Sequence, residues 1–123
     1  MLLTLHARLG RWLQTGGHLE DSDPGLGEAA LREAEEESGL SSLTMDPRPL
    51  LLSAHALPPT VPCAGGEPMV HLDVQYLVVA DRAAAPVVSL ESTAVAWFSR
   101  DALPPVDDSV RALVAAASAR LGW

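Results

Sequence analysis

The chain has 123 residues, of which 48% are apolar, and a formal net charge of −8. This length and apolar content are typical of one compact domain with a buried core. All 8 basic residues are arginine, and they are outnumbered by 16 acidic residues. This balance excludes a basic surface for a nucleic-acid polymer or an anionic membrane.

The first half of the chain predicts a strand at residues 2–7 and a short apolar stretch at 11–14. Residues 15–27 follow, rich in glycine with one proline, and this composition predicts an irregular loop. Residues 28–38 are strong helix formers, and Gly39 stands where a helix C-cap is expected.

The second half begins with residues 43–57, which predict one or two strands interrupted by prolines, and a proline- and glycine-rich loop at 58–68. Residues 69–80 and 93–98 have the composition of strands, and we expect both in one core sheet. From residue 109 to 121 the apolar residues recur at helical spacing, which predicts an amphipathic helix packed on the domain.

The cysteine content and the hydropathy bear on the cellular compartment. Cys63 is the single cysteine, so we expect no intramolecular disulfide, no zinc site made of cysteines and, without a histidine partner, no reactive thiol. No apolar run is long enough to span a bilayer, and residues 1–6 are too short for a signal peptide. We therefore expect a cytoplasmic protein.

The predicted helix carries an unusual concentration of carboxylates. On a helix, Glu33, Glu36 and Glu37 lie on one face, while Glu35 points elsewhere, toward water. Like charges at this spacing destabilise a helix, and a divalent cation with a preference for oxygen ligands would reverse the effect. Taken alone, the run favours an ordinary solvated surface. Arg32 stands four residues before Glu36 and is expected to orient it.

The glycine loop changes this interpretation. The segment "GGHLEDSDPGLGEAALREAEEESGL" resembles a Nudix box, the signature of Nudix (MutT-like) hydrolases, at about residues 17–40. Seven positions match its second half: Arg32, Glu33, Ala34, Glu36, Glu37, Gly39 and Leu40. Asp23 stands where the box has a glutamate, and one residue is inserted between Pro24 and Gly27. Asp23 is either the box acid or the helix N-cap.

The resemblance implies an α/β fold, the Nudix fold, in which a mixed β-sheet lies between helices as an α/β/α sandwich. It extends over most of the chain, so we expect residues 1–123 to form a single domain. We expect the strand that usually precedes residues 2–7 to be missing here: either the sequence as given starts later than the natural product, or another element, such as one from a second subunit, fills the place, which makes a homodimer possible.

The resemblance also implies an activity. Family members typically use Mg²⁺ or Mn²⁺ to hydrolyse the pyrophosphate bond of a nucleoside diphosphate linked to another moiety. Carried over, the metal ligands are Glu33, Glu36, Glu37 and the Gly17 carbonyl, and the general base is Glu33 or Glu91. Two alternatives are a non-catalytic Nudix module that binds a nucleotide or nucleotide sugar, and an acidic protein-interaction domain.

Several further side chains are candidates for substrate binding. Trp12 and Tyr76 would stack on a base, although strand aromatics more often belong to the core. His71 and Asp73 share one face of the predicted strand at 69–80, where they contact substrate or form an ordinary polar face. His18 and His55 lack the sequence spacing of a transition-metal site, so we interpret them as structural or loop residues.

Overall fold

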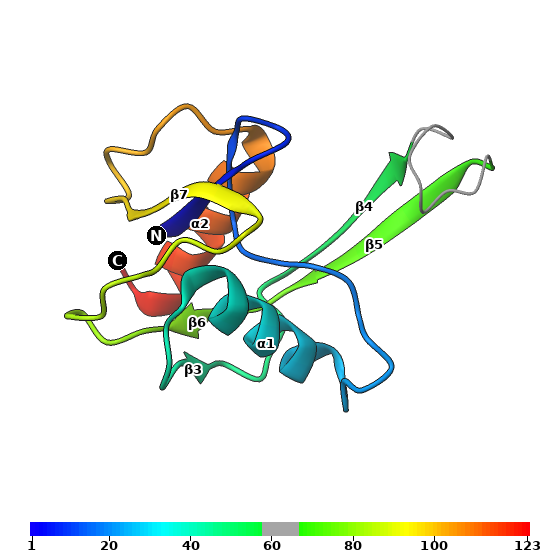
Figure 1. The fold of residues 1–123 in the computed structure, drawn as a ribbon, viewed down its shortest axis with the longest axis horizontal. Helices are drawn as coiled ribbons and strands as arrows, with labels where there is room; N and C mark the ends of the chain where they lie inside the picture. Colours follow the sequence, from blue (N-terminus) through cyan, green and yellow to red (C-terminus); the bar gives the residue numbers. More distant parts are fainter. Residues whose placement is uncertain (58–66) are drawn as a thin grey trace.

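The computed structural model describes residues 1–57 and 67–123, so Cys63 and nearly all of the loop expected at 58–68 lie outside the described residues. The elements, in chain order, are β1 (Leu2–His6), β2 (Trp12–Leu13), α1 (Leu26–Ser38), β3 (Thr44–Met45), β4 (Leu51–Leu57), β5 (Met69–Gln75), β6 (Val78–Val79), β7 (Ser92–Trp97) and α2 (Asp108–Leu121) (Figure 1). Neither helix in this described part is long and apolar enough to cross a membrane.

The strands form three small sheets, in the orders β2-β1-β7, β3-β6 and β4-β5. Every pairing in the described part of the chain is antiparallel. Two helices and these sheets make the predicted α/β class, while the strands expected in one mixed sheet are divided among three.

The strand predicted at 69–80 is interrupted, because β5 ends at Gln75 and β6 begins at Val78. Its partner segment explains the break. Pro47 and Pro49 have no N–H to donate to a ladder, so between β3 and β4 only isolated backbone bonds remain, such as Asp46 N–H to the Leu77 carbonyl at 2.9 Å. The expectation that residues 69–80 and 93–98 share one core sheet is therefore wrong, since β5 pairs with β4 and β7 with β1.

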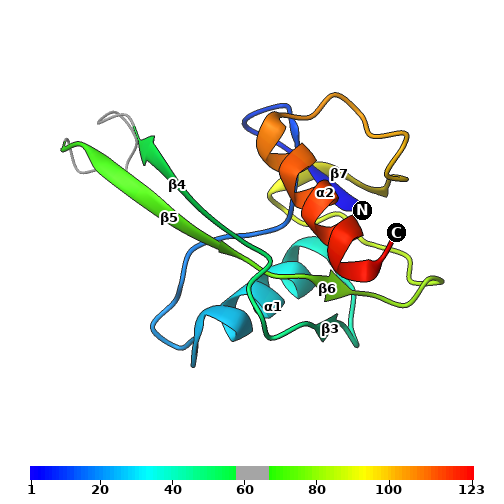
Figure 2. The same ribbon diagram turned by 180° about the vertical axis from the view of Figure 1, so that it is seen from behind.

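Helix α2 supplies much of the core. It lies against the β2-β1-β7 sheet in both views (Figures 1 and 2). Val110 and Leu3 are fully buried, and Leu113 and Val114 are nearly so, which confirms the predicted amphipathic spacing; each such side chain contributes about 1.5–3 kcal/mol. The helix begins where the Asp107 carboxylate accepts the Val110 N–H at 3.1 Å.

Helix α1 is held at both ends. Its N-cap is Gly25, which makes no side-chain cap, so the interpretation of Asp23 as the N-cap is wrong. Near its start, a Cβ on Gly27 would lie 2.8 Å from Met45 Cε, so the helix backbone packs directly on β3. At its end Gly39 adopts the left-handed conformation (φ 66°), as predicted, and the Ser38 carbonyl accepts the Val87 N–H at 2.7 Å.

The β4–β5 hairpin projects from the rest of the molecule (Figure 1). Side chains alternate between its two faces, and Leu52, Val70 and Leu72 on one face are 71%, 56% and 79% exposed. We call the opposite side the polar face of the hairpin; it carries Ser53, His55, His71 and Asp73. The register pairs His55 with His71 and Ser53 with Asp73.

Gly39→Ala should destabilise the protein by more than the approximately 1–2 kcal/mol that a left-handed non-glycine residue costs, because the new Cβ would also lie 2.8 Å from Val87 Cβ. Gly122→Ala is the matched control. Gly122 is also a left-handed helix C-cap (φ 73°) but has nothing within 4 Å of its virtual Cβ. Urea unfolding of both variants measures the difference, and equal losses would contradict the packing role of Gly39.

Candidate active site

Arg32 is the centre of the hydrogen-bond network on α1. Its Nε and one terminal nitrogen donate to the two carboxylate oxygens of Asp23, each at 2.9 Å. The same terminal nitrogen donates to the His18 carbonyl at 3.1 Å. The other donates to Glu33 at 2.9 Å and to Glu36 at 3.1 Å. One guanidinium therefore fixes the preceding loop on the helix and orients two carboxylates, as expected for Glu36.

Asp23 is accordingly the partner of Arg32. Its side chain is only 5% exposed, and its carboxylate also accepts the Glu20 N–H at 2.8 Å. The hydrogen bonds from Arg32, followed by the bond from Glu20, hold the pKa of Asp23 below its usual value. In return, the pKa of the Arg32 guanidinium is raised, with the Asp23 hydrogen bond as the largest cause.

Glu37 has the most perturbed carboxyl of the helix. Burial raises its pKa to about 7; a hydrogen bond from the Gly16 N–H opposes this shift, and the charges of Glu33, Glu91 and Glu36 add to it. Glu91, which comes just before β7, is thus brought to the helix from a distant part of the sequence. A carboxyl with a pKa this high is a frequent mark of a functional site.

The glycine loop lies directly on these carboxylates. A Cβ on Gly17 would stand 2.3 Å from Glu33 Oε1, a distance that no side chain can occupy. The predicted site residues Gly17, Glu33, Glu36, Glu37 and Glu91 therefore gather in one region, which we call the carboxylate site. All of its donors are oxygens, the ligands that Mg²⁺ and Mn²⁺ prefer.

The carboxylate site is open rather than a closed cage. Within residues 1–57 and 67–123, the only group of three His, Cys, Asp or Glu ligand atoms within 4.8 Å of one another is His55, His71 and Asp73. The helix glutamates do not converge this closely. Such a loose oxygen set suits Mg²⁺, which usually keeps several waters and takes one or two carboxylates together with substrate phosphates.

Glu91 lines a pocket of about 320 Å³ with His6, Ala7, Arg8 and Leu90. Its backbone carbonyl accepts the Ala7 N–H at 3.0 Å, which attaches the segment before β7 to the end of β1. The carboxylate itself belongs to an exposed residue. Glu91 thus lines an open pocket and lies near enough to Glu37 for its charge to raise the pKa of that carboxyl.

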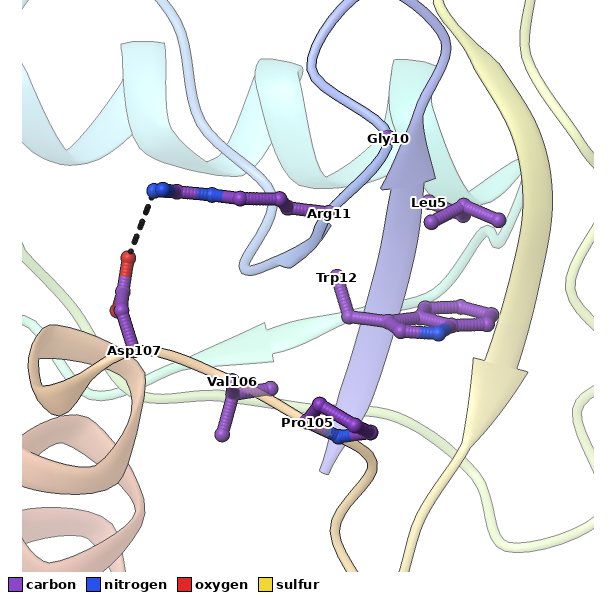
Figure 3. Close-up of a pocket in the computed structure, with 7 residues that line it drawn as sticks. All are labelled: Leu5, Gly10, Arg11, Trp12, Pro105, Val106 and Asp107. Carbon is purple, nitrogen blue, oxygen red and sulfur yellow. Dashed lines mark hydrogen bonds and ion pairs between the residues drawn. The ribbon is translucent and has the colours of Figure 1, made fainter.

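Trp12 lines a second pocket, of about 450 Å³, with Leu5, Gly10, Arg11, Pro105, Val106 and Asp107 (Figure 3). Arg11 bonds Asp107 at 3.2 Å across its mouth. The Trp12 ring also packs edge-on against Phe98, with ring centroids 4.9 Å apart. Trp12 thus has both a packing contact and a surface on a pocket large enough for part of a small molecule.

The remaining candidates lie elsewhere. Tyr76 stands at the bend between β5 and β6, where its ring lies 3.9 Å from a virtual Cβ on Gly27, so it packs on the start of α1. His71 and Asp73 lie on the polar face of the hairpin together with His55. The ring of His18 also lies beside that of His71; the sequence did not predict that His55 and His18 would stand near these candidates, because alternation along residues 51–57 does not fix the strand register.

The comparisons with known proteins agree with this geometry. The NUDIX domain family model matches residues 1–117, and the chain belongs to the Nudix family. The fold is similar to that of a crystallised C. elegans Ap4A hydrolase binary complex, with a TM-score of 0.63 and 21% identity over 98% of this chain and 85% of that chain. No curated protein sequence matches the chain. The predicted Nudix fold is confirmed, and by family the chain is a Nudix pyrophosphohydrolase.

Arg32→Lys should lower the free energy of unfolding by about 1–3 kcal/mol, because lysine cannot bond both oxygens of the buried Asp23 carboxylate. Arg48→Lys is the control, since Arg48 also bonds both oxygens of an aspartate, Asp46, but with a side chain that is 73% exposed; it should change stability by less than about 0.5 kcal/mol. Urea titration measures the free energy of unfolding of both variants. Equal losses would show that the Arg32–Asp23 pair stabilises the protein no more than the exposed Arg48–Asp46 pair does.

Glu37→Gln should make the metal-free protein more stable than the wild type at pH 8, and this advantage should shrink as the pH falls toward 5. The pKa of Glu37 is about 7 in the folded protein and 4.5 ordinarily, so the folded state binds more protons in this window and the wild type loses stability as the pH rises through it. Glu35→Gln, at an exposed position of the same helix, is the control. A pH-independent difference in melting temperature would contradict the shifted pKa.

Proposed function

We propose that this protein hydrolyses the pyrophosphate bond of a nucleoside diphosphate linked to another moiety, using Mg²⁺ or Mn²⁺ at the carboxylate site. The observation that carries the proposal is the half-buried Glu37 carboxyl, which stands beside Glu33, Glu36 and Glu91 and accepts the Gly16 N–H. Folding has brought four acids together against their mutual repulsion. A stable fold tolerates this where a cation compensates the charge.

The donor set fits such an ion. Glu37, Glu36 and Glu33 offer carboxylate oxygens, and the Gly17 backbone is placed against Glu33, so that its carbonyl is a fourth candidate ligand. When bound, Mg²⁺ or Mn²⁺ would neutralise diphosphate oxygens and lower the pKa of a water. Arg32 holds Glu33 and Glu36 at fixed positions on the helix, which limits the reorganisation needed for binding.

The reaction requires a base near the attacking water. The water oxygen forms a bond to phosphorus, the bond from phosphorus to the bridging oxygen breaks, and the leaving phosphate keeps the electron pair. A carboxylate takes the proton of the water. We propose Glu33 or Glu91 for this role. Glu33 is held by Arg32, whereas Glu91 lines its own pocket beside Arg8, whose positive charge would attract a phosphate.

Residues outside the carboxylate site would determine which substrate is accepted. We propose that the pocket at Trp12 receives one moiety of the substrate, since its volume of about 450 Å³ and the Trp12 and Arg11 side chains suit an aromatic or polar group. The packing of Tyr76 on α1 favours a structural role for that residue. The expected homodimer and cytoplasmic location remain predictions; the exposed Leu52 and Leu72 offer apolar surface for association.

The direct test measures nucleoside monophosphate release with Mg²⁺ or Mn²⁺. The panel contains nucleotide sugars, dinucleotide cofactors and dinucleoside polyphosphates, with Ap4A among the last because the similar C. elegans structure is an Ap4A hydrolase. Glu36→Gln and Glu37→Gln should each lower kcat/KM by about 10²-fold or more, the loss expected when an ion that contributes several kcal/mol is displaced. Glu35→Gln should retain full activity.

Two results would count against the hydrolase. Undiminished turnover in both Glu36→Gln and Glu37→Gln would place the reaction outside the carboxylate site. A folded wild type that binds Mg²⁺ and a nucleotide, shown by thermal stabilisation, and leaves every substrate intact would instead support a non-catalytic binding module.

A further inference from the structure

The polar face of the β4–β5 hairpin gathers residues that the sequence keeps apart. His55 on β4 and His71 on β5 are direct cross-strand partners, with ring centroids 5.4 Å apart. Asp73 completes a group whose ligand atoms all lie within 4.8 Å of one another. The ring of His18, from the loop before α1, lies 5.3 Å from that of His71. Three of the 4 histidines in the chain therefore meet at one place.

The chemistry of this group differs from that of the carboxylate site. Two imidazoles and one carboxylate, with a third imidazole adjacent, are the nitrogen-rich ligands typical of zinc and related transition metals. Two ligands on one tetrahedral zinc ion at about 2.0–2.2 Å stand about 3.3–3.6 Å apart. The His55, His71 and Asp73 ligand atoms all lie within 4.8 Å of one another, close to this spacing, and His55 Nδ1 and Asp73 Oδ2 stand 2.9 Å apart.

An ordinary surface contact explains only part of the arrangement. His55 Nδ1 and Ser53 Oγ both contact Asp73 Oδ2, at 2.9 and 3.1 Å, which accounts for one imidazole and one carboxylate. A ligand atom of His71 belongs to the same group, and the His18 ring lies beside the His71 ring. Because the backbone register of β4 and β5 fixes His55, His71 and Asp73 relative to one another, these ligands are preorganised.

We propose that His55, His71 and Asp73 bind Zn²⁺ or a divalent ion of similar ligand preference, with His18 as the fourth ligand. The ion ties the hairpin to the loop before α1. That loop also contacts the carboxylate site, because the His18 carbonyl accepts a hydrogen bond from Arg32 and the neighbouring Gly17 lies on Glu33. The site goes beyond the proposed hydrolysis and requires no turnover, and its nitrogen ligands distinguish it from a Mg²⁺ site.

The test is Zn²⁺ titration of the tag-free full chain in competition with a chromogenic chelator. The wild type should bind one equivalent, and excess Mg²⁺ should not displace it. His55→Ala, His71→Ala and Asp73→Ala should each weaken binding by at least about 10–100-fold. Glu37→Gln should bind as the wild type does, so the outcome is independent of the carboxylate site. His6→Ala removes the one histidine outside the group and Cys63→Ser the only thiol, and both should leave the affinity unchanged.

Co²⁺ substitution tests the fourth ligand. The wild-type visible spectrum should be that of a tetrahedral ion, and His18→Ala should change it while the three hairpin ligands still hold the ion. An unchanged spectrum would remove His18 from the proposal. The whole proposal is overturned if the wild type does not bind Zn²⁺, or if the affinity falls only with Cys63→Ser or Glu37→Gln. Far-UV circular dichroism confirms that each variant remains folded.

Discussion

The bidentate pair between Arg32 and Asp23 is the interaction on which the arrangement of this protein depends. Residues 15–25 contain no strand or helix, so their position relative to α1 must come from side chains. Arg32 provides it through two hydrogen bonds to Asp23 and one to the His18 carbonyl. With the loop fixed in this way, Gly16 reaches Glu37 and Gly17 reaches Glu33. A flexible point charge such as lysine would not hold the same geometry.

This arrangement accepts an electrostatic cost at one place. Arg32 compensates Glu33 and Glu36, whereas Glu37 is left with its burial and with acidic neighbours, which together raise its pKa to about 7. The fold holds the charged Glu37 carboxylate in an unfavourable environment. A cation that binds there would remove this electrostatic cost, and the free energy released would add to the affinity for the cation. From composition alone, the acidic residues of α1 resemble an ordinary solvated face. The tertiary structure instead singles out one carboxyl, that of Glu37, for a large shift in pKa.

The local features were predictable from the sequence, because they depend on neighbours along the chain. The C-terminal end of α1, the shared face of its three glutamates and the left-handed Gly39 follow from helix propensity and periodicity, while the helix begins at Leu26, two residues before the predicted start. The role of Asp23 was not predictable. An N-cap can be predicted from adjacent residues, but the pairing of Asp23 with Arg32 depends on how the loop at residues 15–25 folds back on α1. Likewise, Pro47 and Pro49 lie opposite Tyr76 and divide into β5 and β6 a strand that the sequence predicts as continuous. The pairing of His55 with His71, which are 16 positions apart in the chain, depends on the register of β4 and β5.

The attachment of α1 to the segment before β7 has a mechanical consequence. The Val87 N–H bonds the last turn of α1, and Val87 Cβ fills the space beside Gly39, while four residues further on Glu91 is bonded through its carbonyl to the end of β1. The segment that carries Glu91 is thus bonded at one point to the end of α1 and at another to the end of β1. Neither anchor involves the projecting hairpin, so sequence changes in β4 and β5 leave the attachment of the Glu91 segment to α1 and β1 in place.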